Sequence, residues 1–237
     1  MEDTIRQVGA TMDALTRELR AVSHNLANTN TTGYKRVRTD FSETLSEQLA
    51  VFGQERDESF VDFTSGHLVQ TGRPLDAAIS GLGMFVLETP EGPLYTRNGC
   101  FRVNANGQLS DAHGRTVAGE GGPIVLPPTV SPQQVTIGRD GVVSAAGRRI
   151  GQLRVVWFND PTVLRPAGRS AFAAPEDVRP TEAEEAVVSQ GRLESSNVSG
   201  TEELVRLITI TRLYEANARS VRVNDQRTRK LLDVATS

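Results

Sequence analysis

The chain has 237 residues, enough for one domain of ordinary size with extensions, of which 38% are hydrophobic and 5% aromatic. This low apolar content predicts a small core, or an apolar face that is buried against another chain. The net charge of −3 at pH 7 argues against nucleic acid or an anionic membrane as the main partner. The single cysteine, Cys100, excludes an intrachain disulfide bond.

Residues 1–26 repeat an apolar side chain at alternating steps of four and three. This is an unbroken heptad pattern, which places a narrow apolar stripe on an otherwise polar helix. Because the stripe is so narrow, the helix needs a partner helix that buries it. The stripe consists of Met1, Ile5, Val8, Met12, Leu15, Leu19, Val22 and Leu26.

A polar stretch ends this predicted helix. Residues 28–33 are rich in Asn and Thr, which compete for backbone hydrogen bonds, and Gly33 can adopt a positive φ. Apolar residues at steps of four and three then predict that helix resumes within residues 34–52. Residues 55–66 are expected to be extended or loop-like.

Two charged segments are expected to lie at the surface. Lys35, Arg36 and Arg38 form a small basic cluster, and residues 176–186 form an acidic connector. The basic cluster is too small for a nucleic-acid interface, so we expect it to pair with the acidic connector.

Short apolar runs alternate with turn signals from Gly66 to Phe172. The run 84–87, a Pro-Glu-Gly turn and the run 94–96 predict a hairpin, and residues 101–109 around Asn-Ala-Asn-Gly predict a second one. Glycines at 141 and 147 bound further short strands, and residues 153–158 form the most apolar strand. This spacing predicts a compact antiparallel β domain.

The last 37 residues repeat the heptad pattern of the first 26, more weakly toward the end. Ser199-Gly-Thr-Glu202 fits a capping box and predicts where this helix begins. The apolar and aromatic residues that we expect to pair with the first helix are Leu204, Leu207, Tyr214 and Val221.

The predicted fold class is therefore α+β, with paired N- and C-terminal helices in a coiled coil and an inserted, mainly antiparallel β domain. The expected divisions are 1–35 and 194–237 for the terminal helices, 36–65 for a connector, and 66–193 for the β domain, with the acidic connector at its end.

No pattern of catalytic or ligand-binding residues emerges. His24, His67 and His113 have no partners at metal-ligand spacing, and the Gly-rich segments lack the G-x-G-x-x-G order of a nucleotide loop. We therefore expect no catalysis, no cofactor or metal, no small-molecule substrate and no nucleic acid. The N-terminus has no basic segment followed by an apolar core, so we expect no cleaved signal peptide.

Three motifs resemble the flagellar rod and hook family. "NLANTNTTGYKR" at 25–36 is similar to its N-terminal signature, "LESSNVSGTEELVRLITITRLYEANARSV" at 193–221 to its C-terminal signature, and residues 71–109 to its central region. The resemblance covers nearly the whole chain. The motif residues that we single out are Asn25, Asn28, Gly33, Tyr34, Lys35, Asn197, Tyr214, Glu215 and Asn217.

This resemblance implies a structural subunit of the bacterial flagellar basal-body rod. The resemblance also implies that the chain is exported unfolded by the flagellar type III apparatus, without signal cleavage. It further implies helical assembly in the periplasm with other rod subunits. The rod they form transmits torque from the motor to the hook. The family's paired terminal helices form the inner tube, and its β domain lies outside.

Four features bear on the member of the family that the chain resembles. The stretch 39–65 is short, and "AGEGGPIVLPP" at 118–128 resembles the proximal-rod type. In contrast, "TIGRDGVVS" at 136–144 and "EELV…YEAN" within 202–217 are closer to the distal-rod type. We favour the proximal-rod type, with the distal-rod type as the alternative. A module that binds or acts on the cell wall is a further alternative; its candidate carboxylates would be Glu88, Glu91 and Asp111, which lie in turn-like stretches.

Overall fold

The computed structural model describes residues 2–39, 59–183 and 185–235. The chain divides into two compact units. The helical unit comprises residues 1–27, 37–60 and 199–237, and the β unit comprises residues 28–36 and 61–198. Residues 28–35, which were expected with the terminal helices, lie in the β unit in this division. Among the described residues, no helix is both long enough and apolar enough to cross a membrane.

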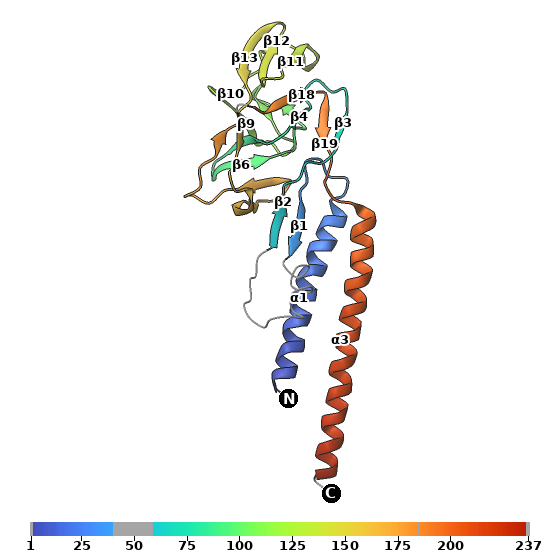
Figure 1. The fold of residues 1–237 in the computed structure, drawn as a ribbon. Coiled ribbons are helices and arrows are strands. Elements are labelled where there is room, and N and C mark those ends of the chain that lie inside the picture. The colour runs from blue at the N-terminus through green and yellow to red at the C-terminus, as the bar shows by residue number, and fades with distance from the viewer. Residues whose placement is uncertain (1, 40–58, 184, 236–237) are drawn as a thin grey trace. The chain divides into compact units, whose positions relative to one another are not determined.

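The helical unit contains two long helices, α1 (Glu2–Ala27) and α3 (Gly200–Ala235). They lie side by side and run in opposite directions (Figure 1). Leu15 and Val22 of α1 and Ile210 of α3 form a buried cluster, on which Leu19, Leu207 and Leu213 also pack. The predicted pairing of two terminal helices is therefore observed, while its coiled-coil geometry remains a prediction.

The predicted start of α3 is also observed. The Ser199 hydroxyl accepts a hydrogen bond from the Glu202 amide at 3.5 Å, which satisfies one of the amides left free in the first turn of a helix.

Polar contacts determine which face of α3 meets α1. The Asn25 side chain donates to Glu203 Oε2 at 3.4 Å, and Arg206 pairs with Glu18 at 3.2 Å. Glu203 is fully buried, whereas its neighbour Leu204 is 48% exposed. The buried face therefore runs through Glu203 and Ile210 rather than through Leu204.

The predicted stripe is corrected accordingly. Tyr214 and Val221 are 40% and 41% exposed, so, like Leu204, they do not belong to the buried pairing within the chain. Of the residues predicted on α1, Val8, Met12 and Leu26 are half-buried. The side chain of Ile5 and all of Met1 lie outside the description.

The helix predicted within 34–52 is wrong for residues 36–39, because these form strand β1 (Arg36–Thr39), which pairs with β2 (Ser59–Asp62). The remainder, 40–52, lies outside the described residues. The Asn25 side chain holds Val37 in the extended form, since it accepts from the Val37 amide and donates to the Val37 carbonyl, both at 2.8 Å.

The β unit is built on a sheet of ten strands within the described residues, with the main order β15-β16-β6-β5-β9-β8-β7. Strand β10 extends it from β9, and β14 pairs with both β5 and β17. The strands are β5 (Met84–Thr89), β6 (Gly92–Thr96), β7 (Arg102–Val103), β8 (Leu109–Ser110), β9 (Thr116–Gly119), β10 (Gly122–Pro123), β14 (Val155–Trp157), β15 (Arg165–Pro166), β16 (Ala171–Ala173) and β17 (Thr181–Glu182).

Smaller sheets complete the unit. Strands β11 (Val135–Ile137), β12 (Val142–Ala145) and β13 (Arg148–Gln152) form one sheet, β3 (Leu68–Gln70) pairs with β19 (Arg192–Glu194), and β4 (Ala77–Ser80) pairs with β18 (Val187–Gln190). Two short 3₁₀ turns lie at Pro132–Gln134 and Pro161–Val163. These pairs are antiparallel. Both predicted hairpins are confirmed as β5–β6 and β7–β8.

Strand β5 contributes side chains to two apolar clusters, one on each of its faces. Phe85 and Leu87 belong to one cluster, where Phe85 packs edge-on against Phe101, and Met84 and Val86 belong to the other. Side chains alternate between the two faces of a strand. The unbroken apolar run of β5 is therefore that of a strand buried on both faces.

We predict that Ile210→Ala destabilises the helical unit and Ile208→Ala does not. Ile210 is 4% exposed and packs on α1, whereas Ile208 is 53% exposed on the same helix. Truncating a buried Ile typically costs about 2–5 kcal/mol, and an exposed substitution changes stability by about 0.5 kcal/mol or less. Thermal unfolding of both variants, followed by helical circular dichroism, checks this; equal midpoints would show that α3 does not pack through Ile210.

Candidate functional site

The N-terminal motif enters the β unit through a tight turn. The Thr31 hydroxyl donates to the Asn28 side chain at 3.0 Å, and the Tyr34 amide donates to the Thr31 carbonyl at 3.2 Å. Gly33 has φ +65°, and its amide donates to the Glu194 carbonyl at 2.8 Å. A Cβ at this position would collide with the backbone of residues 97 and 98. The turn therefore requires glycine, and it delivers the next residues to the interior.

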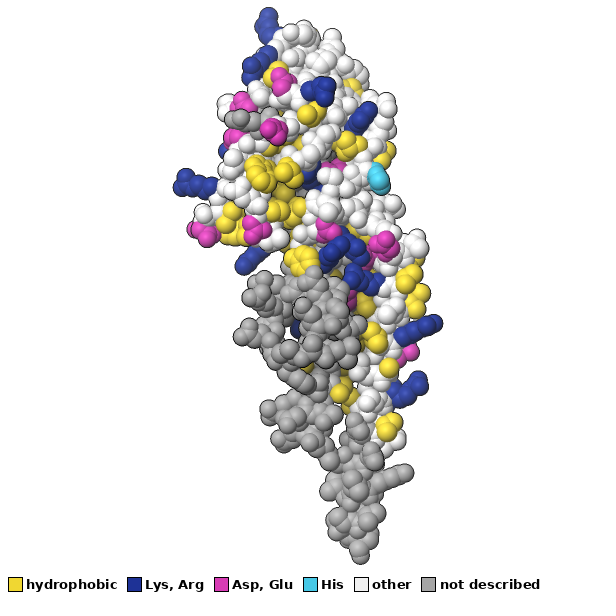
Figure 2. Space-filling model, in the orientation of Figure 1, with side chains coloured by type: hydrophobic (Ala, Val, Ile, Leu, Met, Phe, Trp, Pro, Cys, Tyr) yellow, Lys and Arg dark blue, Asp and Glu magenta, His cyan; other side chains and the backbone are white. Residues whose placement is uncertain are grey.

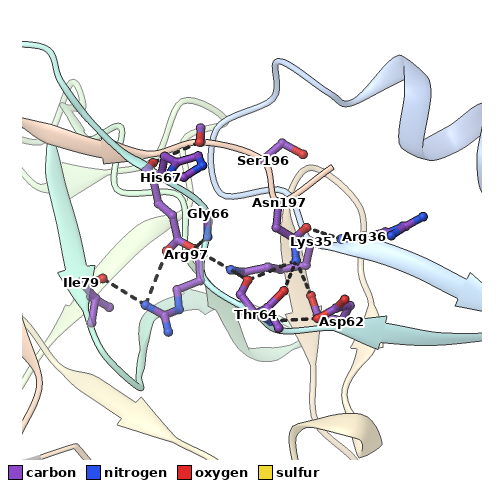
Figure 3. Close-up of polar contacts among 12 residues, drawn as sticks. Lys35, Arg36, Asp62, Thr64, Gly66, His67, Ile79, Arg97, Ser196 and Asn197 are labelled. Atoms are coloured by element: carbon purple, nitrogen blue, oxygen red, sulfur yellow. Dashed lines mark hydrogen bonds and ion pairs between the residues drawn. The ribbon is translucent and has the colours of Figure 1, made fainter. Parts of the chain in front are cut away.

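Lys35 is completely buried at the end of this turn. Its ammonium donates to Glu194 Oε1 at 2.6 Å and to the Thr64 carbonyl at 2.7 Å (Figure 3). Lys35 and Lys230 are the two lysines of the chain, whose 26 basic residues are otherwise arginines. An ammonium is a compact point charge that donates in several directions, whereas a planar guanidinium does not fit such a set of acceptors.

Arg97 brings a second cation to the same carboxylate. Its side chain is 4% exposed, and it donates to the Ile79 carbonyl at 3.2 Å and to the Gly81 carbonyl at 2.6 Å. It also lies 3.5 Å from Glu194 Oε2. One buried carboxylate thus faces two buried cations, which we call the ion cluster: Lys35, Arg97 and Glu194.

The C-terminal motif supplies the other half of the arrangement. Glu194 also accepts from the Gly66 amide at 2.8 Å. Asn197 accepts from the Arg36 amide at 2.7 Å and donates to the Asp62 carbonyl at 2.8 Å. Glu194 and Asn197 therefore hold together three segments of the chain, those around residues 35, 64 and 97.

Burial dominates the electrostatics of the cluster. Burial lowers the pKa of Lys35 below its ordinary value, and the attraction of Glu194 opposes this shift. The pKa of Arg97 is lowered for the same reason and is likewise supported by Glu194. Removing ions from water is costly unless they are paired and hydrogen-bonded, so both cations depend on Glu194 as their counter-charge.

The cluster is built to hold segments together rather than to turn over a substrate. Its three side chains are between 0% and 4% exposed, so no ligand reaches them. Among the described residues, no group of three or more His, Cys, Asp or Glu side chains could hold a metal ion. Asp111, one of the candidate carboxylates, is paired with Arg115, whose Nε and Nη2 both lie 2.6 Å from its Oδ2.

The structure corrects the placement of the basic segment. Lys35 was expected at the surface, opposite the acidic connector, but it is buried against Glu194. Part of the connector is instead a strand, β17, which pairs with β14. No local sequence pattern could predict the burial of Lys35, because its partner Glu194 is 159 positions away in the chain.

The predicted motif residues separate into three groups. Gly33, Lys35 and Asn197 meet around the ion cluster, with Tyr34 buried and Asn28 half-buried nearby in the chain. Asn25 fixes Val37 in the helical unit. Tyr214, Glu215 and Asn217 lie on α3, where Asn217 donates to the Leu213 carbonyl at 2.9 Å. Arg97 and Gly66 were not among the predicted residues. Gly66 is required because the Ser195 backbone leaves no room for a Cβ there.

We predict that Glu194→Gln destabilises the β unit by about 3–5 kcal/mol, because it leaves two buried cations without their counter-charge. The matched control is Glu182→Gln, whose carboxylate pairs with Arg154 at 2.9 Å but is 54% exposed; we expect a loss of about 1 kcal/mol or less. Urea unfolding followed by the fluorescence of Trp157, the single tryptophan, measures both. Equal losses would contradict the assignment.

We predict that the stability difference between the natural chain and Lys35→Met grows in favour of the natural chain as pH rises toward 10.5. The pKa of Lys35 lies below its ordinary value of 10.5 in the folded state. Between the two values the unfolded chain binds more protons, so stability rises with pH. Urea unfolding at several pH values from neutral to alkaline tests this; a difference that shrinks with rising pH would overturn it.

Three family models match the N-terminal part of the chain, part of the β unit and the C-terminal part. A model of the flagella basal body rod protein matches residues 8–35, the FlgE/F/G D1 domain of the flagellar hook protein matches residues 78–145, and the C-terminal model of the flagellar basal body rod FlgEFG protein matches residues 189–234. The first and third contain the motif residues that meet at the ion cluster.

Similar proteins match over most of their length. The flagellar basal-body rod protein FlgF of Caulobacter vibrioides is 35% identical over 213 residues, which cover 86% of each chain. FlgG of Agrobacterium fabrum is 33% identical over 247 residues, covering 91% of this chain and 92% of its own. Proteins of this family are structural parts of the flagellum and not enzymes. The chain therefore belongs to the flagellar hook and basal-body rod family FlgE/F/G, as a basal-body rod protein.

Proposed function

We propose that this rod protein forms the proximal segment of the rod, where copies of it assemble helically and carry torque from the motor to the hook. Its membership of the family makes it a structural subunit that assembles with other rod and basal-body subunits. The chain contributes two parts to such an assembly. One is a helix pair with exposed apolar side chains, and the other is a β unit stabilised by its own buried ion cluster.

The observation that carries the proposal is the apolar surface of α3 that the helix pair leaves uncovered. Leu204, Val205 and Ile208 are each about half exposed, on the side of the helix away from the buried Ile210. Figure 2 shows apolar side chains along the first turns of α3. A contiguous exposed apolar surface is typical of a protein–protein contact, and repeated contacts between different surfaces of identical subunits build helical assemblies.

Further residues of the predicted stripe would take part in the same assembly. Tyr214 and Val221 are exposed in the single chain and available to a neighbouring subunit. The half-buried Val8, Met12 and Leu26 of α1 have apolar surface left for a third helix. The heptad spacing of both helices supports a coiled-coil arrangement in the assembled rod.

A second candidate function is that of a distal-rod subunit. The chain is similar to proteins named FlgF and to proteins named FlgG. The short stretch 39–65 and the segment 118–128 support the proximal type, and the segment 136–144 supports the distal one. A wall-acting module has no such support, since the family is structural.

The route to the rod belongs to the same proposal. We infer export through the flagellar type III apparatus without signal cleavage, and assembly in the periplasm. The net charge of −3 gives no reason to expect nucleic acid among the partners.

We predict that Leu204→Ser abolishes swimming while the chain is still exported and folded. Leu204 does not take part in the buried pairing within the chain, so the polar side chain should disturb contacts between subunits but not the subunit itself. The control is Arg219→Ala, an exposed position on the same helix, which should swim normally. Soft-agar swimming, blotting of the exported chain and electron microscopy of isolated basal bodies measure this; normal rods with Leu204→Ser would refute the proposed surface.

A further inference from the structure

Residues 187–197, which we call the closing segment, complete the β unit at its C-terminal end. Strand β18 pairs with β4 along four residues, and β19 pairs with β3. No other strand of the described residues pairs with β3 or β4. Three of the four residues of β4 are buried, and β18 is the strand that pairs with β4, so β4 lacks its strand partner and part of its cover until the closing segment arrives.

The closing segment also reaches beyond its own strands. The Gln190 side chain donates to the Pro74 carbonyl at 2.7 Å and to the Val135 carbonyl at 2.8 Å. The Gly191 amide donates to the Asp76 carbonyl at 2.8 Å. These acceptors lie in two separate parts of the unit, so the segment connects the stretch just before β4 to strand β11.

The segment belongs to the central apolar cluster as well. Val188 is 2% exposed and lies in the same cluster as Phe85 and Val117 of the large sheet and Phe101, which precedes β7. Loss of the segment would therefore uncover the core of the large sheet and not only one edge of the unit.

The charges of the ion cluster also make the β unit depend on the closing segment. Glu194 is the carboxylate that faces both Lys35 and Arg97, and both cations are buried in the closed unit. Without Glu194 the closed arrangement would hold two positive charges away from water. A chain whose residues 33–36 and 97 stayed open to solvent until Glu194 was in place would avoid this cost.

We propose that the closing segment controls folding of the whole β unit. The unit remains open, with Lys35 in contact with solvent, until residues 33–36 and residues 187–197 are both free to meet. A chain that emerged from a channel end first would then close its β unit only after both segments had emerged. This last consequence rests on the proposed export, whereas the closing itself does not.

The first test uses the unmodified full-length chain in solution, so its result does not depend on export or assembly. Lys35 is identified by mass spectrometry after brief amine labelling in increasing urea, and amide exchange of β5 and β6 is followed in parallel. If the closing segment controls the unit, Lys35 becomes reactive at the same urea concentration at which β5 and β6 lose protection. Labelling of Lys35 at distinctly lower urea, with β5 and β6 still protected, would overturn the proposal.

The second test breaks the segment's own pairing. The Val188 amide donates to the Arg139 carbonyl, so the Ser189 amide points to β4, because successive amides face opposite edges of a strand. Ser189→Pro removes this donor and should expose Lys35 to labelling and cause loss of amide protection in β5 and β6. The matched control is Thr181→Pro, in the exposed two-residue strand β17 just before the segment.

The outcomes of this pair are decisive. Lys35 should stay protected in Thr181→Pro and react as in the unfolded chain in Ser189→Pro. A Ser189→Pro chain whose β5 and β6 amides remain protected would show that the segment covers only its own edge. Exposure of Lys35 in both variants would show that any broken strand opens the unit, and it would equally overturn the special role of the segment.

Discussion

The pairing of one buried carboxylate with two buried cations sets the arrangement of the β unit. A buried ion pair gains little over an apolar pair of the same size, because desolvation offsets most of the attraction. What it adds is specificity, since Lys35 and Arg97 are tolerated in the interior only where Glu194 meets them. Segments that are distant in the sequence are thereby fixed in one register, and two glycines, Gly33 and Gly66, let the backbone approach closely enough.

The helical unit follows a different rule. Its buried face is partly polar, with Glu203 near Asn25 and Glu18 near Arg206, while apolar side chains such as Ile208 remain outside. The same face also buries the apolar cluster of Leu15, Val22 and Ile210. Apolar side chains left outside fit the proposed assembly, in which neighbouring subunits would cover them, and the inner polar contacts fix the register of the two helices.

Local sequence signals predicted the elements well and their partners poorly. The β5–β6 and β7–β8 hairpins and the start of α3 were predictable because turn and capping residues act within a few positions. The face of α3 was not, because apolar spacing cannot recognise a buried Glu203. The extended β1 escaped prediction because its Val37 is held by a side chain of α1. The burial of Lys35 depends on Glu194, far along the chain, and no local pattern reports such a contact.

The central claim, that Lys35 and Glu194 stabilise the β unit as a pair, is tested most directly by a double-mutant cycle. Lys35→Met, Glu194→Gln and the double variant are unfolded in urea with Trp157 fluorescence as the signal. For residues in direct contact, coupling energies are about 0.5–3 kcal/mol, and the account predicts a value in the upper half of this range, with the double variant less destabilised than the two single losses added together. Losses that add to within about 0.5 kcal/mol would show that the two residues act independently and would contradict the account.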